Sequence, residues 1–68
     1  MDDRLTNDVF VGALRRAKAE FLEMPGLKLT VAQAARLWHF DSVLCTAVLS
    51  RLVEQRFLIE TNHSFARA

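Results

Sequence analysis

The chain has 68 residues, of which 51% are hydrophobic, and nine basic against eight acidic residues give it a net charge of +1. A chain of this length buries only about 60% of its unfolded surface, so we expect one small domain whose apolar content favours a partner or self-association. No run of about 18 apolar residues is present, which excludes a membrane-spanning helix. The near-neutral charge also lacks the strongly basic footprint typical of nucleic-acid-binding domains.

The single cysteine, Cys45, excludes a disulfide within the chain and favours a reducing, cytoplasmic environment. The first residues include Asp2 and Asp3 and lack the basic and apolar segments of an export signal. Charge is uneven along the chain, because residues 1–23 carry a net charge of −1 and residues 24–68 a net charge of +2. The positive half is also the half that contains the recognisable motifs.

Residues 1–24 predict a leading helix, regular from about Asp3 to Met24, which ends before Pro25 and Gly26. Two interpretations of its apolar stripe remain open: the stripe covers the core of the domain, or part of it faces a second copy of the chain. The stripe is formed by Phe10, Leu14, Ala17 and Phe21, and it is widened by Val9, Ala13 and Leu22.

Residues 27–29 alternate apolar, polar and apolar, which predicts a very short strand that can pair with a later hairpin. Thr30 and Gln33 have the spacing of a capping box and predict the start of a second helix. This helix runs through Trp38, a packing residue at the turn, and breaks at residues 39–40. Asp41 is a strong N-cap for the next helix.

The third helix is expected from Ser42 to about Gln55 or Arg56, and at 100° per residue it has two distinct faces. The core face contains Leu44, Cys45, Val48, Leu49, Leu52 and Val53. The face that a partner would meet contains Val43, Thr46, Ala47, Ser50, Arg51 and Glu54.

A small hairpin is expected at the end of the chain. Residues 57–61 are rich in strand-forming side chains, residues 62–64 suit a turn, and residues 65–67 can return as a short second strand that frays at its end.

Residues 27–67 resemble the winged helix-turn-helix of bacterial transcription regulators, loosely of the multiple-antibiotic-resistance-regulator type. Residues 29–35 (LTVAQAA) resemble the opening of that motif, with Ala35 where the family has a small residue for close helix packing. Residues 49–59 (LSRLVEQRFLI) resemble its run into the wing.

The resemblance implies a mainly α fold with a small β-hairpin, a three-helix winged helix-turn-helix in the order α-β-α-α-β-β. One domain over residues 1–68 would then contain the leading helix (1–24), a short strand (27–29), the helix-turn-helix (30–56) and the wing (57–67). Two departures concern glycines of the family pattern, because His39 and Arg56 stand where glycine is usual. Both positions favour a left-handed backbone, which costs a non-glycine residue about 1–2 kcal/mol.

The function implied by this resemblance is that of a small double-stranded-DNA-binding protein, a cytoplasmic bacterial regulator of transcription or its accessory. Phosphate contacts would come from Thr30 with the first amides of its helix and from Arg36. The wing would contact the minor groove or the backbone through His63 at its tip and Arg67 beside it. Base edges would be met by Ser42, Val43, Thr46, Ala47 and Ser50. None of these five side chains offers the bidentate pairing that fixes a base.

The alternative is a winged-helix module for protein–protein interaction or dimerisation that does not itself read DNA. An exposed valine and alanine on a largely uncharged helix face suit a protein partner better than an anionic duplex. The predicted surface for a second copy or another protein contains Phe10, Leu14, Ala17, Phe21 and Val43.

Nothing in the chain predicts an enzyme, a cofactor or a small-molecule ligand. His39, Cys45 and His63 do not have the spacing of a zinc site, and Cys45 lies on the core face, as an inert packed thiol would. A glycine-rich phosphate loop and a pair of catalytic carboxylates are both missing from the sequence.

Overall fold

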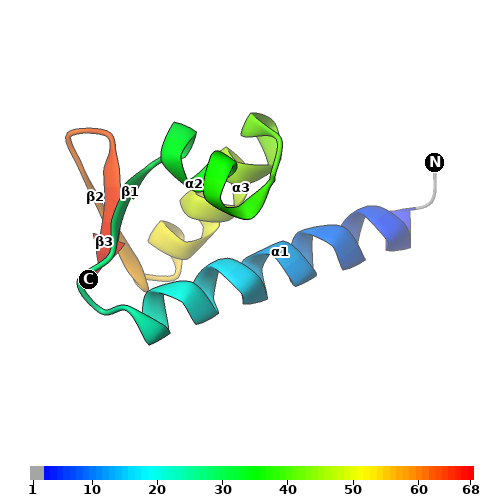
Figure 1. Ribbon diagram of the computed structural model, residues 1–68. Helices are drawn as coiled ribbons and strands as arrows, with labels where there is room; N and C mark the ends of the chain where they lie inside the picture. Colours follow the sequence, from blue (N-terminus) through cyan, green and yellow to red (C-terminus); the bar gives the residue numbers. More distant parts are fainter. Residues whose placement is uncertain (1–2) are drawn as a thin grey trace.

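The computed structural model describes the backbone of residues 3–68 and the side chains of residues 8–68. Its elements are α1 (Asp3–Glu23), β1 (Lys28–Thr30), α2 (Val31–Trp38), α3 (Ser42–Glu54), β2 (Leu58–Thr61) and β3 (Ser64–Arg67). This order confirms the expected α-β-α-α-β-β layout of a winged helix (Figure 1). None of the described helices has the length and apolarity needed to cross a bilayer.

Both helices of the helix-turn-helix begin at the predicted caps. The Thr30 hydroxyl accepts a hydrogen bond from the Gln33 amide at 3.1 Å, and the Gln33 side chain accepts one from the Thr30 amide at 2.9 Å, so the capping box is complete. The Asp41 carboxylate accepts from the Leu44 amide at 3.0 Å and caps α3. These bonds satisfy amides that a helix start otherwise leaves unpaired.

The two non-glycine turn positions have the left-handed backbone that the sequence predicts, with φ of 57° at His39 and 61° at Arg56. The turn of the wing is also left-handed, at Asn62 and His63, with φ of 51° and 65°. Two consecutive residues of this kind make the tight hairpin turn whose twist matches the strands. The predicted three-residue turn was therefore wrong by one residue, because Ser64 already pairs with Thr61 in the ladder.

The predicted short strand at residues 27–29 pairs with the hairpin, as expected. The sheet has the order β1-β3-β2, so β3 is its central strand and bonds to a neighbour on each side. Phe65 lies opposite Leu29 of β1 and Glu60 of β2. The amide of Ala68 extends this pairing by donating to the Phe57 carbonyl at 3.1 Å.

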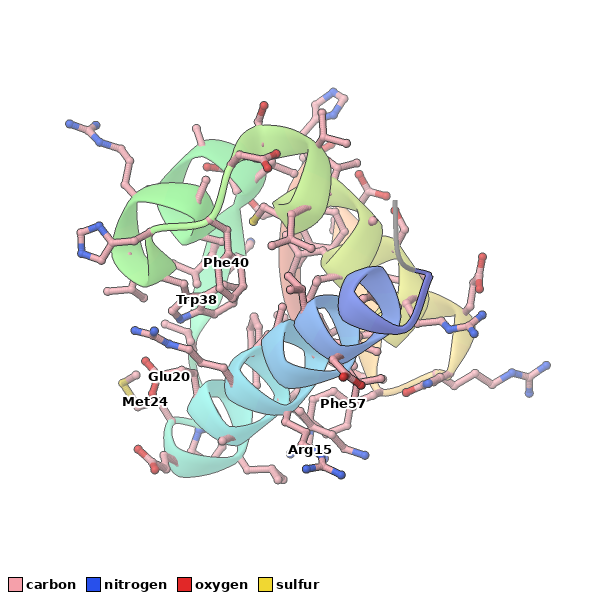
Figure 2. The ribbon with its side chains drawn as sticks, turned by 90° about the vertical axis from the view of Figure 1, so that its right-hand side faces the viewer. Arg15, Glu20, Met24, Trp38, Phe40 and Phe57 are labelled. Atoms are coloured by element: carbon pink, nitrogen blue, oxygen red, sulfur yellow. The ribbon has the colours of Figure 1, made fainter. Side chains whose placement is uncertain are left out.

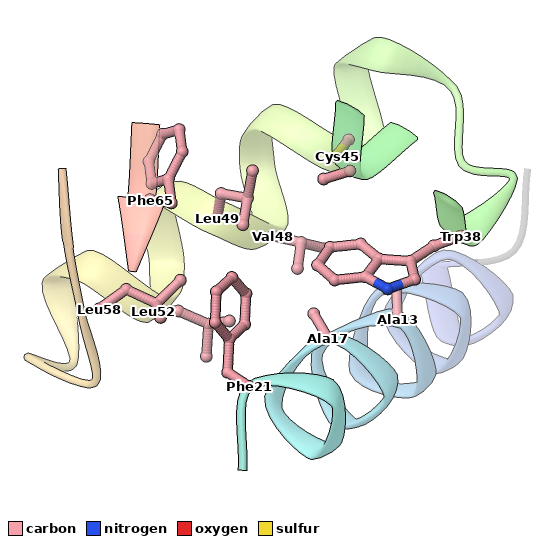
Figure 3. Packing of buried hydrophobic residues seen from close by; sticks show 11 residues of the cluster. Ala13, Ala17, Phe21, Trp38, Cys45, Val48, Leu49, Leu52, Leu58 and Phe65 are labelled. Carbon is pink, nitrogen blue, oxygen red and sulfur yellow. The ribbon is translucent and has the colours of Figure 1, made fainter. Parts of the chain in front are cut away.

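A single apolar cluster joins α1, the helix-turn-helix and the sheet (Figure 3). From α1 it takes Ala13, Ala17 and Phe21, and the Phe21 ring meets the Trp38 indole edge-on with centroids 6.1 Å apart. The stripe of α1 therefore covers the core, as one of the two interpretations required. The remaining buried side chains are Ala34, Cys45, Val48, Leu49, Leu52, Leu58 and Phe65.

Three details of the predicted packing need correction. Val9 and Leu22 do not widen the buried stripe, because 58% and 54% of their surfaces are exposed. The tightest small residue of α2 is Ala34, which is completely buried, whereas Ala35 is only partly buried against the core. The Ala35 carbonyl instead closes the helix by accepting from the amides of His39 and Phe40.

Candidate nucleic-acid interface

The outer face of α3, which we define by Ser42, Val43, Thr46, Ala47 and Ser50, is exposed at all five positions. Its orientation is fixed by the opposite face, where four consecutive inward positions are completely or almost completely buried: Cys45, Val48, Leu49 and Leu52. Val43 is the most exposed large apolar residue among the described side chains, at 78%. The predicted contact residues of this helix are therefore brought together on one accessible, uncharged strip.

Hydrogen-bonding capacity on this strip is limited. The Thr46 hydroxyl donates to the Ser42 carbonyl at 2.8 Å, one turn earlier, so its proton is already used within the helix. Its oxygen can still accept a bond from a base amino group. Ser42 and Ser50 are exposed and make no side-chain hydrogen bond among those described, so they can either donate or accept.

Positive charge near the outer face of α3 is sparse. Arg51 forms an ion pair with Glu54 at 3.3 Å, the one ion pair among the side chains that the structure describes. Arg36 is exposed in the last turn of α2, and no carboxylate among the described side chains lies within ion-pair distance of it. Asp41 adds a carboxylate at the start of α3, where it is used as the helix cap. Arg36 is thus a cation of α2 that is available to a phosphate.

Thr30 is half-buried at the start of α2, where its hydroxyl accepts a hydrogen bond from the Gln33 amide. The proton of this hydroxyl is not used in that bond and can still be donated to a phosphate. The amides of Val31 and Ala32 are further donors at this helix start.

The two predicted wing residues do not lie side by side. His63 is exposed in the hairpin turn, whereas Arg67 lies at the base of the hairpin opposite Leu58. The placement of Arg67 beside the wing tip was wrong because the return strand begins at Ser64 and carries Arg67 four residues away from His63. His63 alone is left at the tip.

Arg67 instead takes part in a cluster that the sequence did not indicate. Its guanidinium carbon lies 4.5 Å from the centroid of the Phe57 ring, and Lys18 Nζ of α1 lies 5.2 Å from the same centroid. Such cation–aromatic contacts stabilise by about 0.5–1 kcal/mol at exposed sites. Figure 2 places Phe57 and Arg15 on one side of α1, with Trp38 and Phe40 on the other. The signal in the sequence was only a phenylalanine three residues after the end of α3, which the hairpin prediction assigned to a strand.

The predicted partner surface on α1 is largely internal. Ala17 and Phe21 are completely buried in the core of this chain, so they are not available to a second copy. Phe10 and Leu14 are half-buried and pack against the same core. Val43 of that predicted set is the residue that remains open to a partner.

The thiol and the histidines stay apart in the described part of the chain. Cys45 is completely buried, and its Sγ lies 3.7 Å from the Val31 carbonyl. Burial, reinforced by the negative charge of Asp41, raises the pKa of this thiol, which keeps it protonated. Among the described residues no three His, Cys, Asp or Glu side chains are grouped as metal ligands.

Comparisons of the chain with protein-family models, with curated proteins and with solved structures found no match.

Proposed function

We propose that this chain is a small, non-enzymatic DNA-binding protein of the bacterial cytoplasm that acts as a transcription regulator or its accessory. The observation that carries the proposal is the outer face of α3, a strip of small uncharged side chains on a 13-residue helix capped at its start. A helix of this length is about 20 Å long, and its diameter of about 10–12 Å fits the major groove, which is about 12 Å wide. The resemblance to the multiple-antibiotic-resistance-regulator type supports the same assignment.

The side chains on the outer face of α3 indicate which contacts it would make with a DNA duplex. Small side chains allow the helix backbone to approach base edges closely, and Val43 and Ala47 suit the methyl group of thymine. Ser42 and Ser50 can bond to several different base edges, which gives weak discrimination between sequences. Shape and deformability of the duplex would then contribute much of the preference.

Few phosphate contacts are expected from this surface. Arg36, the amides of Val31 and Ala32 and the wing residue His63 are the groups positioned for them. Because each neutralised phosphate contributes about −0.9 to the slope of log affinity against log salt, two or three contacts predict a slope of about −2 to −3.

A titration of a fluorescent duplex of mixed sequence, at salt concentrations of about 50 and 200 mM, tests the proposal. We expect binding at the lower salt that weakens by about 10- to 100-fold at the higher one. A single strand of the same length serves as the control, since it offers no major groove. The proposal fails if the duplex is not bound at the lower salt.

The alternative function, a winged-helix module that binds another protein, is favoured by one observation. Val43 exposes 78% of its surface on a face that otherwise carries small residues. An apolar anchor of this kind suits the desolvated centre of a protein interface. Both functions use the same face of α3, and the duplex titration separates them.

A further inference from the structure

The outer face of α1 points away from the core, and we define it by Asp8, Gly12, Arg15, Arg16 and Ala19. All five residues are exposed, whereas Ala13 and Ala17 on the opposite side of the helix are buried. The molecule is 37 Å long but only 20 Å wide, and the N-terminal end of α1 extends beyond the helix-turn-helix (Figure 1). Two exposed valines lie along this extension, Val9 and Val11.

Neither the backbone conformation nor the packing of a single copy requires glycine at position 12. Its backbone does not have a positive φ, and a Cβ built at this position would meet no atom within 4 Å. Glycine is the least favourable residue for a helix interior after proline, so an unconstrained position of this kind favours alanine. What glycine does permit is the close approach of a second helix at that point.

Two of the three charges around Gly12, those of Asp8 and Arg16, are arranged for an antiparallel neighbour, whereas Arg15 would lie opposite Val9. Asp8 lies one turn before Gly12 and Arg16 one turn after it, each about 6 Å away along the helix axis. If two copies of α1 cross antiparallel at Gly12, each Asp8 meets the Arg16 of the other copy, and the twofold axis makes two such pairs. A parallel crossing would bring together two aspartates and two arginines, which repel.

We propose that a second copy of this chain docks on the outer face of α1, with the two helices crossing antiparallel at Gly12. This interface differs from the α1 stripe, which is buried in the core of each copy. It is independent of DNA binding, and it would place an outer face of α3 on each side of a symmetric dimer. A contact made by one helix from each copy is small, so the dimer is expected only at high micromolar protein or above.

Charge reversal tests the pairing. Sedimentation of the whole chain without DNA, from about 10 μM to 1 mM, is expected to show a mass that rises from one copy towards two. Asp8→Arg and Arg16→Asp should each weaken the association by about tenfold, because each places like charges together. The double variant, Asp8→Arg with Arg16→Asp, should restore it. A chain that stays monomeric over the whole range, or a double variant weaker than either single one, would overturn the proposal.

Two substitutions at Gly12 separate docking from folding. Gly12→Ala and Gly12→Leu should both raise the melting temperature of the monomer, since each favours the helix and meets no atom of its own chain. Gly12→Leu should abolish dimerisation because its side chain fills the crossing point. Dimerisation of Gly12→Leu as strong as that of the unmodified chain contradicts the proposal. Because every measurement is made without DNA, its outcome is separate from that of the duplex titration.

Discussion

Replacing Phe21 with alanine should lower the free energy of unfolding by about 3–5 kcal/mol. Phe21 is completely buried and joins α1 to the helix-turn-helix through its edge-on contact with Trp38. A chain of 68 residues is expected to have only about 3–10 kcal/mol of stability, so the substitution should remove between about a third and all of it. Urea denaturation followed by circular dichroism measures the change.

Leu22 provides a matched control for that experiment. It is the next residue of the same helix, yet 54% of its surface is exposed. Leu22→Ala should therefore change the stability by less than about 1 kcal/mol. Equal effects of the two substitutions would mean that α1 does not pack through the face containing Ala17 and Phe21.

Replacing Ala47 with glutamate should weaken binding of a DNA duplex at least about tenfold, because a carboxylate would then lie against the phosphates and base edges. Ala47 is exposed at the centre of the outer face of α3, so the substitution should leave the fold intact. The measurement is the same fluorescent titration at low salt, with the circular dichroism spectrum recorded for each variant.

Leu22→Glu is the control for net charge in this second experiment. It makes the same change in net charge as Ala47→Glu, but at an exposed position of α1 instead of α3. Its affinity for the duplex should stay within about twofold of the unmodified chain, since a distant exposed charge is largely screened by salt. If Leu22→Glu weakens binding as much as Ala47→Glu does, the outer face of α3 is not the contact surface.

The elements of this fold could be predicted where local chemistry decides them. Thr30 with Gln33, and Asp41 with the amide of Leu44, place both helix starts to the residue. The spacing of apolar residues in α3 likewise distinguishes its buried face from its outer face in the sequence alone. His39 and Arg56 have left-handed backbones, as expected for the two positions where the family pattern has glycine, although neither is glycine.

What could not be predicted depends on contacts between distant segments. Arg67 was expected near the wing tip, but its position is set by the register of β3 against β2, which a one-residue shift of the turn changes. Its contact with Phe57, shared with Lys18 of α1, joins three segments that are far apart in sequence. The exposure of Val9 and Leu22 depends on how much of the α1 surface the rest of the chain covers, and periodicity alone does not specify that width.

The most direct test of the proposed function is a nuclear magnetic resonance titration of the ¹⁵N-labelled chain with a short duplex at about 50 mM salt. DNA binding through the outer face of α3 predicts the largest shifts for amides between Ser42 and Arg51, with smaller ones at Val31, Ala32 and His63. The amides of α1 around Arg15 and Lys18 should move least. Absence of any shift, or shifts confined to α1 and the Phe57 cluster, would contradict the assignment of α3 as the DNA-contacting helix.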